Sequence, residues 1–248
     1  PYDIILTSRD TKLGDKAINT LKAKHPNSTS TLTYHQLDVN DDKSVENLLH
    51  WFKGTSWLNG VNRKIDVLVN NAAVLYYKSE DSLKKHTIQT NFFGVVNLTE
   101  KFIPFLSDDA KILQISSFLG QLSFQGKILQ RALTDPRLTE KRLHEIAHNV
   151  IELTPDFPAF DPIVESSYPA SKALLNFYVK DFLPAKLKPT QQVYLVNPGW
   201  VKTDLGGEQA PLTMEEGIDT PIYLINLPHK IHPELNAKLI GERKVMAF

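Results

Sequence analysis

The chain has 248 residues, with 28 basic and 28 acidic side chains and no cysteine. A formal net charge of zero gives no overall field that would attract nucleic acid or an anionic membrane. The lack of cysteine excludes disulfides, thiolate metal sites and cysteine nucleophiles. No apolar run reaches the roughly 18 residues that span a bilayer, and the opening "PYDIIL" has no signal-peptide pattern. We expect a cytoplasmic protein that acts on a small molecule, without metal, nucleic acid or membrane partners.

Short runs of β-branched residues alternate with longer amphipathic segments along the chain. The runs occupy residues 2–8, 30–39, 64–72, 111–117 and 191–199. Apolar residues at helical spacing predict a helix over 41–52, capped by Asp41 or Asn40, and another from about residue 82 to 105. This alternation predicts one α/β domain, residues 1–248, built on a doubly wound, Rossmann-type parallel sheet. Ligands of such sheets bind at the carboxyl ends of the strands.

A long connection, residues 121–165, interrupts this alternation. Five of its residues lie on one face of a predicted helix, namely Leu143, Ile146, Ala147, Val150 and Ile151. The stretch "TPDFPAFDP" that follows is a loop broken by prolines. Two interpretations remain open: a helical insert that covers apolar surface, or a lid over the substrate.

Polar residues follow the first three predicted strands. Arg9 lies where a guanidinium can bind a 2′-phosphate, although an exposed arginine in a loop is usually only solvated. Asp38 can accept from an adenine amino group, or it can simply stabilise a turn. In "NNAA", the side chains of Asn70 and Asn71 can hydrogen-bond to the backbone in a tight turn, while the two alanines leave room for a flat ligand. Each of these signals also has an ordinary structural explanation.

Stronger signals follow the last two strands and open a helix. A hydroxyl of Ser116 or Ser117, in "ISSFLG", can polarise a carbonyl oxygen, although paired serines at a strand end often only cap. The stretch "NPGWVKTD" turns the backbone sharply after the fifth strand. In "SSYPASKALLNFY", Tyr168 and Lys172 lie four residues apart, so a helix places them on one face. Pro169 is compatible with this arrangement if the helix begins near Tyr168, because proline costs little in the first turn.

The motifs "NNAA", "TNFFG", "ISSFLG", "YPASK" and "NPGWVKTD" come in the order and approximate spacing of the short-chain dehydrogenase/reductases. The chain resembles this family over nearly its whole length. It is most similar to the monomeric NADPH-dependent carbonyl reductases. This similarity is based on the stretches "HQLDV" and "EEGIDTPIYL" and on the long insert before the tyrosine. The resemblance implies an oxidoreductase that reduces aldehydes, ketones or quinones to alcohols, and a monomer because the insert would cover the usual dimer face.

The resemblance places a catalytic tetrad on Asn91, Ser117, Tyr168 and Lys172. Tyr168 would donate a proton to the carbonyl oxygen and Ser117 a hydrogen bond. Lys172 would favour the phenolate of Tyr168 by its charge and hold the nicotinamide ribose. Asn91 would order a water molecule that links the lysine to solvent; without the family pattern, a polar residue that faces outward is the preferred interpretation.

The same resemblance implies NADPH as cofactor. Arg9 and Lys12 would bind the 2′-phosphate, and Tyr168 and Lys172 would contribute to the nicotinamide side. The remaining cofactor-binding residues implied are Asp38 and Val39 at the adenine, Asn70, Asn71 and Ala72 at the adenosine ribose, and Pro198, Gly199, Val201 and Thr203 at the nicotinamide. The substrate pocket would be lined by Ser117, Phe118, Leu119, Tyr168 and Trp200.

The sequence departs from the family at its beginning. The family opens with a strand and a glycine-rich turn that hold the cofactor pyrophosphate, whereas this sequence begins at the second strand and has no GxGxxG cluster. Either roughly 30 upstream residues are missing from the sequence, or the protein is a truncated relative that binds a partner without catalysis. The intact tetrad favours the first explanation. An NAD-linked alcohol dehydrogenase or an epimerase is a further alternative.

Overall fold

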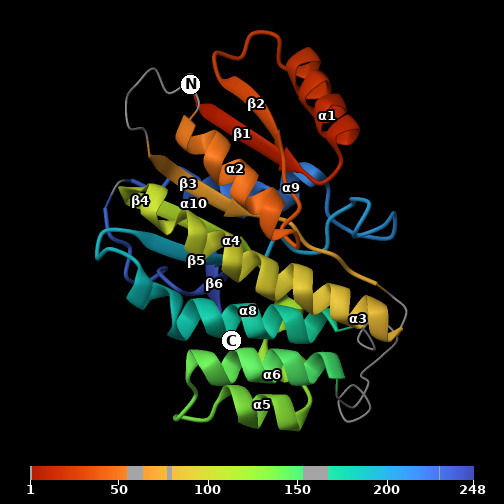
Figure 1. Cartoon of the computed structure of the whole chain (residues 1–248), viewed down its shortest axis with the longest axis vertical. Coiled ribbons are helices and arrows are strands. Elements are labelled where there is room, and N and C mark those ends of the chain that lie inside the picture. The colour runs from red at the N-terminus through yellow and green to blue at the C-terminus, as the bar shows by residue number, and fades with distance from the viewer. Residues whose placement is uncertain (1, 55–63, 77–79, 153–166, 229) are drawn as a thin grey trace. The chain divides into compact units, whose positions relative to one another are not determined.

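The computed structural model describes residues 2–54, 64–76, 80–152, 167–228 and 230–248. The chain forms two compact parts, residues 1–63 and 64–248 (Figure 1). Each part is built from alternating strands and helices. The expectation of one domain over residues 1–248 stays a prediction.

The smaller part is two successive strand and helix pairs. It comprises β1 (Asp3–Ser8), α1 (Thr11–Lys24), β2 (Thr31–Gln36) and α2 (Asp42–Gly54). β1 runs parallel to β2, with Asp3 opposite Thr31. The predicted apolar face of α2 is buried, and Asp41 Oδ1 accepts from Lys43 N (3.0 Å) at the start of that helix, as expected of a cap. Sequence analysis missed α1, because only Gly14 and Ile18 of this polar helix are buried.

The larger part contains a five-stranded sheet in the order β3-β4-β5-β6-β7. Its strands are β3 (Ile65–Asn70), β4 (Leu106–Ile115), β5 (Gln192–Val196), β6 (Leu239–Gly241) and β7 (Lys244–Met246). Its α-helices are α3 (Asp81–Ile88), α4 (Val95–Phe102), α5 (Lys127–Leu133), α6 (Glu140–Glu152), α8 (Tyr168–Asp181), α9 (Met214–Gly217) and α10 (Asp219–Ile225). The pairs from β3 to β6 are parallel, and β7 is antiparallel to β6. The predicted α/β fold with a parallel central sheet is confirmed.

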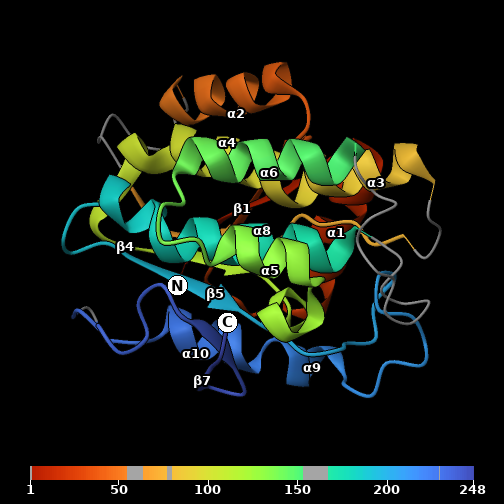
Figure 2. The same ribbon diagram turned by 90° about the horizontal axis from the view of Figure 1, so that it is seen from below.

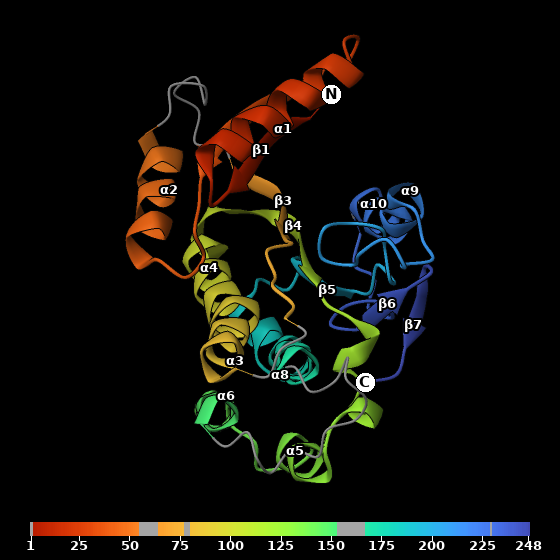
Figure 3. The ribbon, with the colours of Figure 1, turned by 90° about the vertical axis from the view of Figure 1, so that its right-hand side faces the viewer.

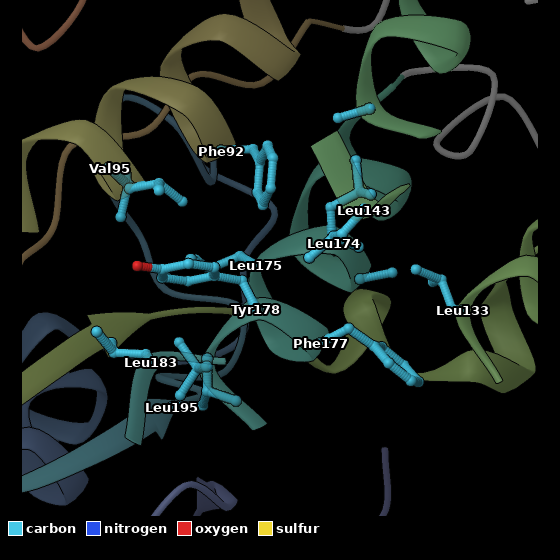
Figure 4. Close-up of a cluster of buried hydrophobic side chains, with 14 of the residues drawn as sticks. Phe92, Val95, Leu133, Leu143, Leu174, Leu175, Phe177, Tyr178, Leu183 and Leu195 are labelled. Carbon is cyan, nitrogen blue, oxygen red and sulfur yellow. The ribbon is translucent and has the colours of Figure 1, made fainter. Parts of the chain in front are cut away.

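Both faces of this sheet are covered, as a doubly wound fold requires (Figure 3). Alternate residues of β4 enter different cores: Ile112 packs with α4 and α8, whereas Leu113 packs with α10. The larger core is shown in Figure 4, where Phe92, Leu174 and Tyr178 lie in one cluster between the helices. Strands buried on both faces explain why the sequence shows continuous apolar runs here.

The helix expected over about 82–105 is interrupted in its middle. α3 passes into a π-helical turn, η2 (Gln89–Gly94), which leads into α4 and then into a short 3-10 turn, η3 (Ile103–Phe105). A π-helical turn inside an α-helix is rare and is often found at functional sites. Asn91 lies in this turn.

Part of the insert, residues 121–165, is described. After the 3-10 turns η4 (Phe118–Gly120) and η5 (Leu122–Phe124), it forms α5 and α6. α6 packs against α3 and α8, with Leu143, Ala147 and Val150 almost fully buried (Figures 1 and 2). The helical insert is therefore a cover for apolar surface in this segment. The side chain of Ile151 and the loop "TPDFPAFDP" lie outside the described residues, so the lid interpretation of the loop is untested.

Among the described strands, four pair on one side only: β1, β2, β3 and β7. β1 pairs with β2 alone and β3 with β4 alone, so each presents one row of unpaired backbone groups. Among the described helices, none is long and apolar enough to span a membrane.

Candidate active site

Helix α8 brings Tyr168 and Lys172 to the carboxyl end of β4. It begins at Tyr168 with Pro169 in its first turn, as the sequence predicts. Both side chains are buried, and the Lys172 ammonium lies 5.5 Å from the centre of the Tyr168 ring. Lys172 Nζ donates to the carbonyl of Ile115, the last residue of β4 (2.7 Å). The predicted pair is therefore held together at a strand end.

Burial dominates the electrostatics of Lys172. Its side chain is 2% exposed, and the loss of water around the ammonium lowers its pKa from 10.5 to about 7. The lysine can therefore gain or lose a proton near neutral pH. The predicted effect of its charge on Tyr168 remains a prediction.

Ser117 follows β4 by two residues and caps the 3-10 turn η4. Its Oγ accepts a hydrogen bond from Leu119 N (3.1 Å), and a hydroxyl that accepts can still donate its O–H to a ligand. Ser116 is different, because its hydroxyl is buried and already donates to Asn176 Oδ1 (2.5 Å). Of the two adjacent serines, Ser117 is thus the one suited to polarise a carbonyl oxygen.

Asn91 is fully buried and joins two parts of the site. Its Oδ1 accepts from Val74 N (2.8 Å), and its Nδ2 donates to Val74 O (2.9 Å) and to Ser171 Oγ (3.1 Å). Ser171 Oγ in turn donates to the carbonyl of Tyr168 (2.7 Å). The interpretation of Asn91 as an outward-facing polar residue is wrong. Its predicted role in ordering a water molecule stays a prediction.

The predicted cofactor residues of the larger part lie after β3 and β5. Asn70 is buried and its Nδ2 donates to Thr99 Oγ1 (2.9 Å), so this side chain holds helix α4 to the sheet, while Asn71 and Ala72 are exposed. After β5, Pro198, Gly199 and Val201 are partly buried and Thr203 is exposed. Gly199 has a φ of 80°, a conformation that favours glycine, and this turns the chain away from the sheet.

The predicted substrate residues come from two loops. Phe118 and Leu119 of η4 are partly buried, and the Phe118 ring lies edge-on to that of Phe124, with 5.6 Å between ring centres. Trp200 is 43% exposed, and its indole Nε1 donates to Gly206 O (2.7 Å). Their predicted contact with substrate is untested.

Four further predicted cofactor residues belong to the smaller part. Arg9 and Lys12 are exposed, at the end of β1 and the start of α1. Asp38 Oδ1 accepts from Asn40 N (2.9 Å), so the turn interpretation of Asp38 holds whether or not it also contacts adenine. Val39 is buried.

Two structural side chains of the site escaped sequence analysis. Asn176, one turn beyond Lys172 on α8, bonds both Ser116 and Gly120. Asn197, directly after β5, accepts from Phe118 N (3.2 Å) and Gly199 N (3.3 Å). The spacing of Asn176 from Lys172 is visible in the sequence, but its partners are distant in the chain.

Comparison with known proteins agrees with this arrangement. The family model for the short chain dehydrogenases matches residues 1–129. The chain is 32% identical to (+)-neomenthol dehydrogenase of Arabidopsis thaliana, over 93% of this chain and 85% of that protein. It is also 32% identical to human carbonyl reductase (NADPH) 3, over 91% of this chain and 82% of that protein.

Solved structures share the fold. Salutaridine reductase from Papaver somniferum superposes with a TM-score of 0.78 at 24% identity, over 96% of this chain and 90% of that one. The NADPH-bound carbonyl reductase from chicken fatty liver gives a TM-score of 0.69 at 23% identity, over 100% of this chain and 88% of that one. With the motifs in family order, the parallel sheet and the family match over more than half of its length, this chain belongs to the short-chain dehydrogenase family of oxidoreductases.

Proposed function

We propose that the protein is an NADPH-dependent reductase of aldehydes, ketones or quinones, with Asn91, Ser117, Tyr168 and Lys172 as its catalytic tetrad. The observation that carries the proposal is the position of Tyr168 and the buried Lys172 beside Ser117 at the carboxyl end of β4. The relatives named as NADPH carbonyl reductases support the cofactor and the substrate class.

The residues on the nicotinamide side fit such a cofactor. Lys172 Nζ carries up to three N–H donors and, within the described residues, donates one hydrogen bond, to Ile115 O. The other donors suit the hydroxyl groups of a ribose. Exposed Arg9 and Lys12 are cations of the kind that binds a 2′-phosphate.

The chain's own residues account for the proton and for the charge on oxygen. The bound nicotinamide supplies the hydride that is added to the carbonyl carbon. Tyr168 transfers its hydroxyl proton to the carbonyl oxygen as the alcohol forms. Ser117 donates its free O–H to the same oxygen and so stabilises the negative charge that develops there.

Lys172 and Asn91 support this step. Lys172, whose pKa is about 7, favours the phenolate of Tyr168 when protonated, and its N–H groups hold the nicotinamide ribose. Asn91 fixes the loop after β3 and, through Ser171, the first turn of α8. The relative named as a dehydrogenase supports reversibility toward alcohol oxidation.

The test is a fluorescence titration of the purified chain with NADPH and NADH, followed by turnover of an aldehyde, a cyclic ketone and a quinone. We expect NADPH-selective binding and oxidation of NADPH that depends on the carbonyl compound. If the chain binds neither cofactor and turns over none of the three, it acts as a non-catalytic binding relative. Turnover with NADH alone would instead favour an NAD-linked alcohol dehydrogenase.

A further inference from the structure

A single buried amide connects the loop of Ser117 to the helix of Tyr168 and Lys172. Asn176 lies on α8 and is fully buried. Its Oδ1 accepts from Ser116 Oγ (2.5 Å), and its Nδ2 donates to the carbonyl of Gly120 (3.1 Å). The two bonds hold both ends of the segment 116–120, and Ser117 lies between them.

The spacing along α8 makes Asn176 part of the catalytic face. Residues four apart lie on one face of a helix, so Tyr168, Lys172 and Asn176 follow one another along it. Lys172 Nζ donates to Ile115 O, and Asn176 bonds Ser116, the residue that directly follows Ile115. One helix face therefore determines where β4 ends and where the loop of Ser117 begins.

Gly120 shows how closely the loop approaches α8. A Cβ atom at this position would lie 2.7 Å from Asn176 Nδ2 and 2.9 Å from the backbone oxygen of Lys172. Any side chain at 120 would push the loop away from the helix. The absence of a side chain and the Asn176 amide act together to keep the two elements in contact.

Two other attachments of the loop lead to β5 and to the residue that follows it. Ser116 N donates to Val196 O (2.7 Å), and Phe118 N donates to Asn197 Oδ1 (3.2 Å). These bonds fix the loop relative to the sheet but do not fix its distance from α8. Among the described residues of α8, Asn176 alone has a side chain that bonds both ends of the segment 116–120.

We propose that Asn176 is a positioning residue for carbonyl reduction, which sets the separation of the Ser117 hydroxyl from the Tyr168 hydroxyl. This inference rests on the proposed function, in which one carbonyl oxygen must be within hydrogen-bonding distance of both. Misplacement of such a group by about 1 Å can reduce a rate by about a hundredfold. Asn176 acts through Ser116 and Gly120 and does not itself contact the substrate.

The experiment is a double-mutant cycle on Asn176→Ala and Ser116→Ala, with Val179→Ala as control. Val179 is equally buried on the same helix and belongs to the apolar core. We expect Asn176→Ala to reduce kcat by roughly tenfold or more, with little change in the Kd of NADPH. Ser116→Ala should reduce kcat less, because the bond to Gly120 remains. The double variant should have the same kcat as Asn176→Ala, because the Ser116 hydroxyl has already lost its partner once Asn176 is replaced.

The control separates positioning from stability. Asn176→Ala and Val179→Ala should both lower Tm, but only Asn176→Ala should reduce kcat and increase hydrogen exchange in residues 116–121. Two outcomes would overturn the inference and leave the proposed reductase function intact. One is an unchanged kcat in Asn176→Ala. The other is a double variant whose loss of kcat equals the product of the losses in the two single variants. If the wild-type chain shows no turnover, the proposed function fails; unchanged exchange in residues 116–121 of Asn176→Ala would then overturn the positioning role as well.

Discussion

Two buried lysines, one on β4 and one on α8, show how a side chain's partners indicate its role. Lys111 of β4 donates to Ile225 O (2.8 Å) and Leu227 O (2.5 Å). Two carbonyls at and just after the end of α10 therefore replace water around its buried ammonium. Lys172 donates to Ile115 O alone among the described residues. Burial lowers the pKa of both lysines. Lys111 is thus a helix-end contact, whereas Lys172 keeps donors for a ligand.

The buried ammonium of Lys172 makes stability depend on pH. Its pKa is about 7 in the folded chain against 10.5 in the unfolded chain. Below pH 7 both states bind the proton, and the folded state bears the full cost of the buried charge. From pH 7 to 10.5 the unfolded state binds more protons, so the free energy of unfolding rises with pH, by up to about 1.4 kcal/mol per pH unit.

Replacement by methionine tests this linkage. We expect the stability advantage of Lys172→Met over the wild type to decrease between about pH 7 and pH 9.5, measured by urea unfolding. Lys22→Met, at an exposed position on α1, should follow the wild type throughout. Parallel curves for Lys172→Met and the wild type would show that the pKa of Lys172 is not lowered.

The proton donor is tested by Tyr168→Phe. Loss of a general acid usually reduces a rate by about a hundredfold to ten thousandfold, so we expect turnover to fall by that range. NADPH binding should be largely unchanged, as measured by fluorescence titration. Tyr194→Phe is a matched control, because Tyr194 packs in the core on the α10 side of the sheet. Retained turnover in Tyr168→Phe would contradict the assignment.

At the scale of elements, the insert helix α6 is joined to the main fold by charge as well as by apolar packing. Lys186 Nζ donates to Glu100 Oε1 of α4 (2.6 Å) and to Glu140 Oε1 of α6 (2.7 Å). The Tyr178 hydroxyl of α8 also donates to Glu100 (2.7 Å). Lys186 therefore links the first turn of α6 to α4.

Removal of this link should loosen α6 alone. Lys186→Ala leaves Glu100 and Glu140 without their shared cation, and we expect a loss of about 1 kcal/mol in the free energy of unfolding. Hydrogen exchange should increase in residues 140–150 and stay unchanged in β4. Lys188→Ala is the control, because that lysine pairs only with the exposed Asp108 among the described residues. Equal exchange in α6 for both variants would refute the link.

The elements that sequence analysis found and missed differ mainly in their length. The strands β3, β4 and β5 and the helix α2 were predicted because their apolar residues are numerous and regularly spaced. The short strands β6 and β7 and the helices α9 and α10 were missed, since each has seven residues or fewer, too few for an apolar pattern to repeat clearly. The interruption of the 82–105 helix at Asn91 was also missed, because a π-helical turn does not change the apolar pattern.

The candidate site was predictable where its residues are neighbours in sequence. The four-residue spacing of Tyr168 and Lys172 requires only a helix, and the helix begins where expected. Asn176 was missed because its partners, Ser116 and Gly120, lie far away in the chain and meet it only after β4 packs beside α8. Tertiary hydrogen bonds of this kind leave no periodic signal in the sequence.

At the scale of the whole molecule, the predicted cofactor residues are divided between the two compact parts. Arg9, Lys12, Asp38 and Val39 belong to residues 1–63, and the others to residues 64–248. Cofactor preference is therefore testable in the smaller part without a change to the tetrad. This makes Arg9 the informative position.

We expect Arg9→Ala to weaken NADPH binding by roughly tenfold or more and NADH binding hardly at all, because only NADPH has the 2′-phosphate. Fluorescence titration with both cofactors measures the ratio. Lys22→Ala, which removes an exposed cation from α1, should leave both affinities unchanged. Equal losses for the two cofactors in Arg9→Ala would remove the 2′-phosphate assignment.

Oligomeric state follows from what α6 covers. Its inner face buries Leu143, Ala147 and Val150 against the fold, including α3 and α8, so this surface is occupied within one chain. Its outer face carries Lys141 and an Arg142–Glu145 ion pair (2.9 Å), whose burial in a dimer would require desolvation of charges. We expect sedimentation at micromolar concentration to give the mass of one chain. A stable dimer or tetramer there would mean that another surface carries the contact and that the insert does not determine assembly.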